Sequence, residues 1–130
     1  APADIALEVA LAPEVGEEVV ISRTNYSEMY YSAAQQLCHH TSSGCAMRTG
    51  DLLGSGTISG PDKGMFGSLL EMTWGGKDPL TLDGGETRTF IEDGDTLALH
   101  GHAQGDGYRI GFGSCVGSVL SATNTGEGQT

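Results

Sequence analysis

The sequence predicts a mainly β fold with one α-helix. Glycine accounts for 21 of the 130 residues, about 16 %, where an average protein has roughly 7 %. The glycines are not periodic and are interspersed with aliphatic and aromatic residues, which favours short strands joined by tight turns over disorder or collagen. Only one segment carries apolar residues at helical spacing. At this length we expect one domain with one core.

The first elements are predicted from the positions of apolar residues. Residues 4–12 carry Ile5, Leu7, Val9 and Leu11 at every second position, and residues 17–22 form a second short extended run, so both are expected to be strands. A helix should begin at Asn25, whose side chain can cap it while Glu28 reaches back, and it should end before Gly44. Its apolar positions are Tyr26, Met29, Tyr30, Ala33 and Leu37.

The segment after the helix is predicted to contain only strands and turns. Residues 61–64 carry Pro and Gly and indicate a loop. Residues 69–74 are predicted to form a strand, because alternation would place Leu70, Met72 and Trp74 on one face.

The C-terminal part predicts a β-meander. Acidic, glycine-containing turns at 83–86 and 92–95 divide residues 80–102 into short extended segments. A further turn leads into a last strand within residues 108–120. Residues 123–130 are polar and indicate a frayed tail.

Charge and cysteine usage narrow the class of protein. Six basic and 17 acidic residues give a net charge of −11, which disfavours nucleic acid and anionic membranes as partners. The chain has no apolar run of the ~18 residues that a membrane span needs, and its first residues lack a secretion signal. The three cysteines lack CxxC spacing and predict free, buried thiols in a cytoplasmic protein. They are Cys38, Cys45 and Cys115.

Several catalytic motifs are absent. The chain has no dinucleotide fingerprint, phosphate-binding loop, nucleophile elbow or helical zinc motif. His100 and His102 would share one face of a strand, as some metal ligands do, but an exposed pair of histidines is the favoured interpretation. A second cluster matches no common zinc spacing, so structural packing is favoured there too. It comprises Cys38, His39, His40 and Cys45.

Two features are candidates for function. Glu71 lies between Leu70 and Met72, and a carboxylate in such a place must face water or be matched to a partner. In residues 54–60, flanking glycines would let backbone N–H groups and hydroxyls approach a bound carboxylate or phosphate. The alternatives are a solvent-facing strand residue for Glu71 and a β-bulge or hairpin corner for residues 54–60.

Five blocks of sequence together resemble the fumarylacetoacetase family. The resemblance runs in order from about residue 4 to residue 120. The blocks are residues 35–41 (QQLCHHT), 48–53 (RTGDLL), 56–61 (GTISGP), 66–71 (FGSLLE) and 104–113 (QGDGYRIGFG).

The resemblance implies a fold, a reaction and two site residues. The fold would be part of a mixed β-sandwich roll. The reaction would be metal-dependent hydrolysis of a carbon–carbon bond in the diketo acid 4-fumarylacetoacetate, giving fumarate and acetoacetate in tyrosine and phenylalanine degradation. Glu71 matches the catalytic Glu of a Glu–His pair, and Thr57 matches a threonine that binds the substrate carboxylate. The family binds Ca²⁺ or Mg²⁺ through carboxylates and is expected to be a homodimer when complete.

The resemblance covers only the C-terminal part of the family's catalytic domain, which would be residues 1–122. The metal ligands, the catalytic His and the other substrate-binding residues are expected upstream, so none is assigned in this chain, which alone should be inactive. Unpaired strand edges and apolar faces should therefore be exposed. Two alternatives stay open: a related keto-acid hydrolase or decarboxylase, and a non-catalytic assembly or dimerisation module derived from the fold.

Overall fold

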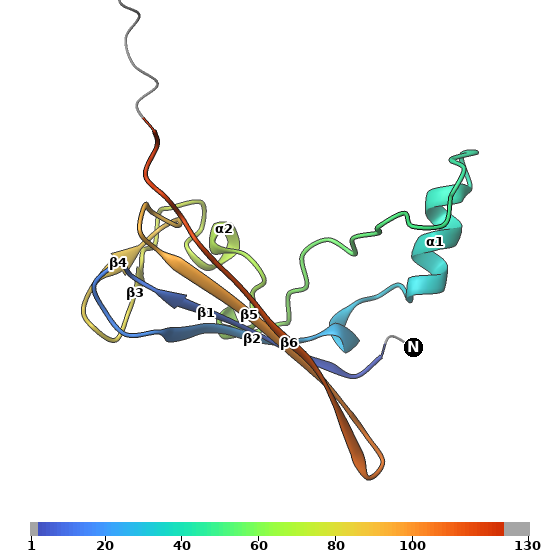
Figure 1. Cartoon of the computed structure of the whole chain (residues 1–130), viewed down its shortest axis with the longest axis horizontal. Coiled ribbons are helices and arrows are strands. Elements are labelled where there is room, and N and C mark those ends of the chain that lie inside the picture. The colour runs from blue at the N-terminus through green and yellow to red at the C-terminus, as the bar shows by residue number, and fades with distance from the viewer. Residues whose placement is uncertain (1–2, 124–130) are drawn as a thin grey trace, which may run out of the picture.

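A four-stranded antiparallel sheet dominates the computed structural model, which describes residues 3–123. Its strand order is β2-β1-β5-β6, and a separate two-stranded sheet pairs β3 with β4 (Figure 1). Within the described residues only one helix is longer than a single turn, so the mainly β class with one main helix is confirmed. The strands are β1 (Ile5–Ala12), β2 (Val19–Asn25), β3 (Leu80–Thr81), β4 (Thr87–Arg88), β5 (Thr96–Gly105) and β6 (Tyr108–Ser118).

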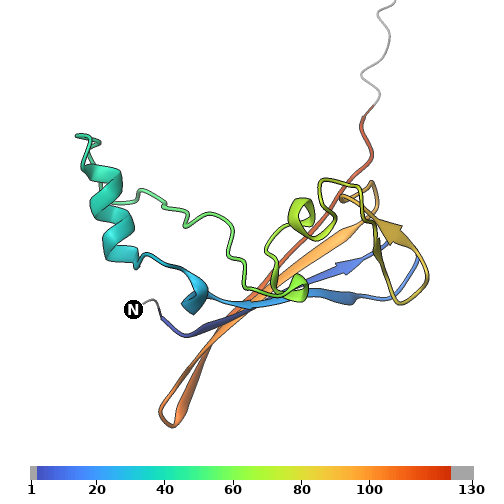
Figure 2. The same cartoon turned by 180° about the vertical axis from the view of Figure 1, so that it is seen from behind.

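The core lies at the end of the large sheet where the small elements gather. Figures 1 and 2 show β3, β4 and the short helix α2 (Leu69–Met72) at this end, whereas the long helix α1 (Ala33–Thr41) stands apart at the other. The buried apolar residues come from β1, β5, α2 and the end of the β3 segment. They are Ala10, Leu11, Met72, Leu82 and Ala98.

The helix begins later than the sequence predicted. Asn25 caps only a 3-10 turn, η1 (Tyr26–Glu28), because its side-chain oxygen accepts hydrogen bonds from Ser27 N and from Ile5 N on β1. Ser32 is the true cap of α1, and it forms a capping box with Gln35 in which each side chain accepts a hydrogen bond from the other backbone. The predicted end before Gly44 is confirmed.

The predicted strand at residues 69–74 is wrong, because these residues form α2 and the turn that follows it. Ser68 caps α2 by accepting a hydrogen bond from Glu71 N at 3.3 Å. Trp74 then takes a φ of +50°, which ends the helix in the left-handed region. Met72 is buried whereas Trp74 is 73 % exposed, so the two do not share one face.

Three smaller expectations also need correction. The β-meander over residues 80–102 is broken, because β5 pairs with β1 and β6 and not with β4. The predicted loop at 61–64 contains a 3-10 turn, η2 (Lys63–Met65). The cysteines are free, as predicted, but all three are exposed, since they lie on α1, on the loop after it and on the outer strand β6.

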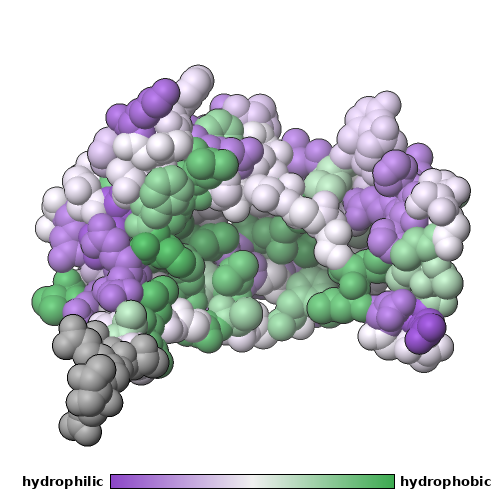
Figure 3. Space-filling model, turned by 90° about the horizontal axis from the view of Figure 1, so that it is seen from above, coloured by the Kyte–Doolittle hydropathy of each residue, from purple (hydrophilic) through white to green (hydrophobic). Residues whose placement is uncertain are grey.

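Exposed apolar surface was predicted and is present. Strand β6 forms an edge of the sheet, and every one of its residues is exposed. Its large apolar side chains are between half and two-thirds exposed. Seen from above, the molecule is hollowed, and hydrophobic side chains gather in the hollow (Figure 3). The exposed apolar residues of β6 are Tyr108, Ile110, Phe112 and Val116.

A buried ion pair joins the small sheet to the large one. Arg88 on β4 donates to both carboxylate oxygens of Asp95 at 2.9 Å, and Asp95 is fully buried. Glu92 N also donates to Asp95, and Val119 N donates to the Asp95 carbonyl. The hydrogen bonds from Arg88, followed by that from Glu92 N, lower the pKa of Asp95 in spite of its burial. Asp95 in turn raises the pKa of Arg88.

We expect Asp95→Asn to lower the free energy of unfolding by about 3 to 5 kcal/mol, since it removes the buried carboxylate that accepts two hydrogen bonds from the largely buried Arg88 guanidinium. Because the folded-state pKa of Asp95 is lowered, the contribution is fully present above about pH 4. It is lost as the pH falls through that lowered value. Urea unfolding of both forms between pH 7 and pH 2 should therefore show the difference shrinking in acid.

The matched control is Glu86→Gln. Glu86 lies 3.7 Å from Arg88 and its side chain is 43 % exposed, so its loss should cost less than about 1 kcal/mol. Equal losses for the two variants would contradict the importance of the buried pair.

Candidate functional site

The segment that carries Thr57 lies directly against the segment that leads to Glu71. A Cβ on Gly67 would collide with the Ile58 carbonyl and would lie 2.7 Å from Thr57 Cγ2, so only glycine permits this approach. Gly60 N donates to Met65 O, and the buried Ser22 on β2 donates to Phe66 O at 2.7 Å. These bonds attach the two segments to each other and to the large sheet.

Glu71 is held by two serine hydroxyls. Ser59 Oγ donates to Glu71 Oε2 at 2.7 Å, and Ser68 Oγ lies 3.2 Å from the same oxygen. Ser59 Oγ also accepts a hydrogen bond from Gly67 N at 3.0 Å. No group in residues 3–123 donates to the other carboxylate oxygen, Oε1. Glu71 is exposed, and its carboxylate is oriented through Oε2 while Oε1 has no donor in the described residues, so a catalytic role for Glu71 stays a prediction.

A buried threonine fixes the helix that carries Glu71. Thr73 is fully buried, and its hydroxyl lies 2.7 Å from Leu69 O and 3.1 Å from Thr89 O. The same oxygen accepts a hydrogen bond from Gly76 N. Thr73 therefore joins the end of α2 to the chain that follows β4, and Glu71 stands on an anchored element.

Thr57 and Glu71 are related through the backbone of Gly67. Its methyl group contacts the Gly67 backbone, whereas Glu71 reaches the same backbone through Ser59. Thr57 is exposed, and its hydroxyl has no hydrogen bond within the described part of the chain. The two predicted site residues are therefore both exposed, and both lie near Gly67. Residues 54–60 form neither the strand bulge nor the hairpin corner considered as an alternative, since they pair with no strand.

The histidines lie on other elements. His39 and His40 are on α1, where His40 Nε2 lies 3.3 Å from Cys45 Sγ, and no hydrogen bond joins either to Glu71. His100 and His102 on β5 both line a pocket of about 290 Å³ above β1 and β2, as their predicted common face requires. Among residues 3–123 no group of three or more His, Cys, Asp or Glu side chains could hold a metal ion.

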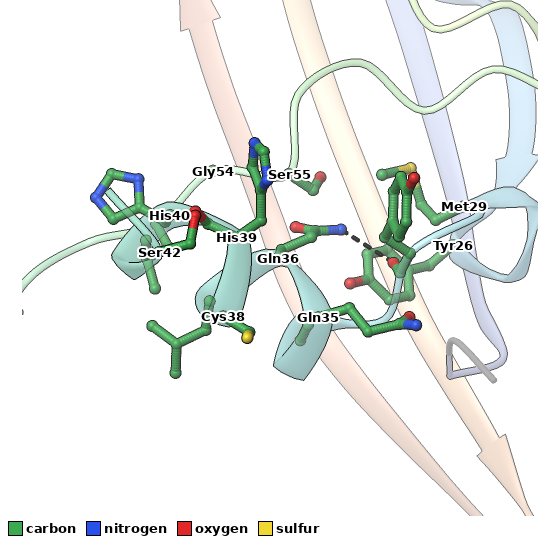
Figure 4. Close-up of a pocket in the computed structure, with 14 residues that line it drawn as sticks. Tyr26, Met29, Gln35, Gln36, Cys38, His39, His40, Ser42, Gly54 and Ser55 are labelled. Carbon is green, nitrogen blue, oxygen red and sulfur yellow. Dashed lines mark hydrogen bonds between the residues drawn. The ribbon is translucent and has the colours of Figure 1, made fainter. Parts of the chain in front are cut away.

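A second, larger pocket is also distinct from Glu71. It has a volume of about 910 Å³ and lies between α1, the chain before α1 and residues 53–55 (Figure 4). Gln36 projects toward Tyr31 there and donates to its carbonyl at 3.1 Å. Neither Thr57 nor Glu71 lines this pocket.

Sequence reasoning did not assign a role to Ser59 or Ser68. The spacing of Ser68 and Glu71, three residues apart, is a cap signal that could have indicated the helix and the Ser68 contact. Ser59 lies 12 residues from Glu71 and is brought to it only by the tertiary fold. No helix in the described residues is long and apolar enough to cross a membrane.

Comparison with known proteins shows that the chain is similar to fumarylacetoacetases from several organisms. A fumarylacetoacetase of Rattus norvegicus is 52% identical over 120 residues, which are 92% of this chain and 29% of the relative. One of Arabidopsis thaliana is 50% identical over 118 residues, which are 90% of this chain and 28% of the relative. One of Aspergillus fumigatus is 54% identical over 119 residues, which are 92% of this chain and 27% of the relative.

The chain therefore spans less than a third of the length of these relatives. A family model described as fumarylacetoacetate (FAA) hydrolase C-terminal matches residues 1–120. Since this match covers nearly the whole sequence, the chain belongs to the fumarylacetoacetate hydrolase C-terminal family.

Proposed function

We propose that this chain is the C-terminal portion of an enzyme that hydrolyses the carbon–carbon bond of 4-fumarylacetoacetate to fumarate and acetoacetate, a step of tyrosine and phenylalanine degradation. The observation that carries the proposal is the identity of about half of all residues, over nine-tenths of the chain, with proteins named fumarylacetoacetase. The oriented carboxylate of Glu71 supports it, since such a group suits general acid–base work.

Glu71 is proposed as the carboxylate of a Glu–His pair. Its free Oε1 would accept a hydrogen bond from an imidazole supplied by sequence beyond this chain, because the histidines described here make no contact with it. The carboxylate would orient that imidazole and stabilise the positive charge that develops as the imidazole takes a proton from water. Thr57, whose hydroxyl is exposed and free, is proposed to donate to a carboxylate of the substrate.

A divalent metal, Ca²⁺ or Mg²⁺, belongs to the same proposal. The described residues do not fit a metal site, because hard cations require several oxygen ligands held together and no such group is present in residues 3–123. Its ligands would come from sequence beyond this chain, and no step is assigned to the metal here.

The proposed partners are the upstream part of the same enzyme and a second copy of the complete protein. The exposed β6 edge offers backbone and apolar surface that such parts could cover. The proposed location is the cytoplasm. The division of the chain into a domain at 1–122 and a tail at 123–130 stays a prediction, and most of that tail lies outside the described residues.

We expect the 130-residue chain to bind Ca²⁺ and Mg²⁺ only weakly, with no submicromolar site, because it lacks a cluster of oxygen ligands. Isothermal titration calorimetry of residues 1–130 measures this directly, with the complete enzyme as the positive control. A submicromolar site on the isolated chain would contradict the proposed division of ligands.

In the complete enzyme, Glu71→Gln should lower kcat by about 10²- to 10⁴-fold with little change in KM or melting temperature. The amide preserves the volume of the side chain but removes the charge that would stabilise an imidazolium. Turnover of 4-fumarylacetoacetate per folded enzyme, measured beside thermal unfolding, checks this. Glu18→Gln, in an exposed loop between β1 and β2, is the matched control.

Normal turnover by Glu71→Gln would end the catalytic role of Glu71. A complete wild-type protein without any such turnover would favour the assembly module, and turnover of another keto acid alone would favour the related hydrolase or decarboxylase.

Thr57→Val should raise KM for 4-fumarylacetoacetate more than it lowers kcat, since a hydroxyl on a remote carboxylate stabilises ground and transition states alike. The expected cost is about 1 to 3 kcal/mol, that of leaving a charged acceptor without one donor. Steady-state kinetics would test this, with Thr81→Val on β3 as the control for an exposed threonine. An unchanged KM would remove Thr57 from the site.

A further inference from the structure

The hydroxyl of Ser59 makes hydrogen bonds to two other segments of the chain, at Gly67 and at Glu71. It lies on the segment after Thr57, its Oγ accepts from Gly67 N at 3.0 Å, and it donates to Glu71 Oε2 at 2.7 Å. A serine hydroxyl has one proton, and here it is donated to Glu71 because an ionised carboxylate can only accept, whereas the Gly67 N–H can only donate to Ser59 Oγ. The carboxylate fixes the direction of this bond, and the bond from the Gly67 backbone helps to hold the hydroxyl in place.

Both serine hydroxyls approach the same oxygen of Glu71. Ser68 Oγ lies 3.2 Å from Oε2, but it is also the cap of α2 and accepts from Glu71 N. Ser59 gives the shorter contact, and it comes from outside the helix. Two contacts on Oε2 hold the orientation of the carboxylate, and Oε1 accepts no hydrogen bond within the described residues.

We propose that Ser59 is a positioning residue, whose hydroxyl fixes the Glu71 carboxylate so that Oε1 is aimed at its catalytic partner. This inference rests on the proposed function, since it requires that Glu71 act in the reaction. Ser59 itself need not touch the substrate. It acts through Glu71 and should affect turnover more than substrate binding.

In the complete enzyme, Ser59→Ala should lower kcat about 10- to 100-fold, the range expected for loss of a hydrogen bond to a charged group. The KM for 4-fumarylacetoacetate should change less than about threefold, because substrate contacts are unaffected. Ser114→Ala removes a hydroxyl on β6 that bonds to His100 and not to Glu71. As the matched control it should keep normal kcat.

A double-mutant cycle with Glu71→Gln separates positioning from a merely structural role. If Ser59 acts through the carboxylate, Ser59→Ala should cost at most about threefold in kcat in the Glu71→Gln background. The same 10- to 100-fold loss in both backgrounds would show that Ser59 acts independently of Glu71 and would overturn the proposal. So would normal kcat for Ser59→Ala in an enzyme that Glu71→Gln inactivates, although the proposed function would then stand.

Normal turnover by Glu71→Gln would instead overturn the catalytic role of Glu71 and the Ser59 inference with it. Should Ser59→Ala fail to fold, Ser59→Cys replaces it, because a thiol fills similar space and is only a weak donor. A reduced kcat per folded enzyme is expected for Ser59→Cys, and normal kcat would overturn the proposal.

Discussion

The buried pair of Arg88 and Asp95 is the interaction on which the arrangement of the small elements depends. Asp95 opens the last hairpin of the large sheet, whereas Arg88 lies on β4 of the separate two-stranded sheet. The next residue after Arg88 is Thr89, whose carbonyl lies 3.1 Å from the hydroxyl of Thr73 at the end of α2. The position of Glu71 is thus connected to the sheet through a short series of buried polar contacts, which hold geometry more firmly than exposed contacts do.

The long strands could be predicted from the sequence because their apolar residues alternate over enough positions to exclude a helix. Strand β1 confirms this, since large aliphatic residues occupy every second position from Ile5 to Leu11. The strand prediction for residues 69–74 was wrong because a segment of six residues fits the period of a strand and the period of a helix equally well. Two features that alternation does not detect favour a helix there: the local Ser68 cap and the long-range contact of the buried Thr73 hydroxyl with Thr89 O.

The start of α1 could not be settled by local signals alone. Asn25 and Ser32 are both good caps with a suitable residue three positions on. Asn25 is drawn to β1 by the bond from Ile5 N, a contact between residues 20 apart. Ser32 has no such competitor and forms the box with Gln35. The burial of Cys38 was wrongly predicted for a related reason: α1 stands away from the sheet and buries none of its side chains within the described residues.

In the candidate site too, the residues could be identified from the sequence, whereas their contacts depend on the tertiary fold. Glu71 and Thr57 were identified through a family resemblance, whereas their proximity arises from Gly67, whose missing side chain lets Thr57 and Ile58 approach. That approach brings Ser59 to Glu71, where the Ser59 hydroxyl donates a hydrogen bond to Oε2 of the carboxylate. The two serine contacts fall on Oε2, so both acceptor positions of Oε1 remain open to a further donor. A carboxylate that is anchored through one oxygen and open at the other is rigid and can still orient a group supplied by another part of the protein.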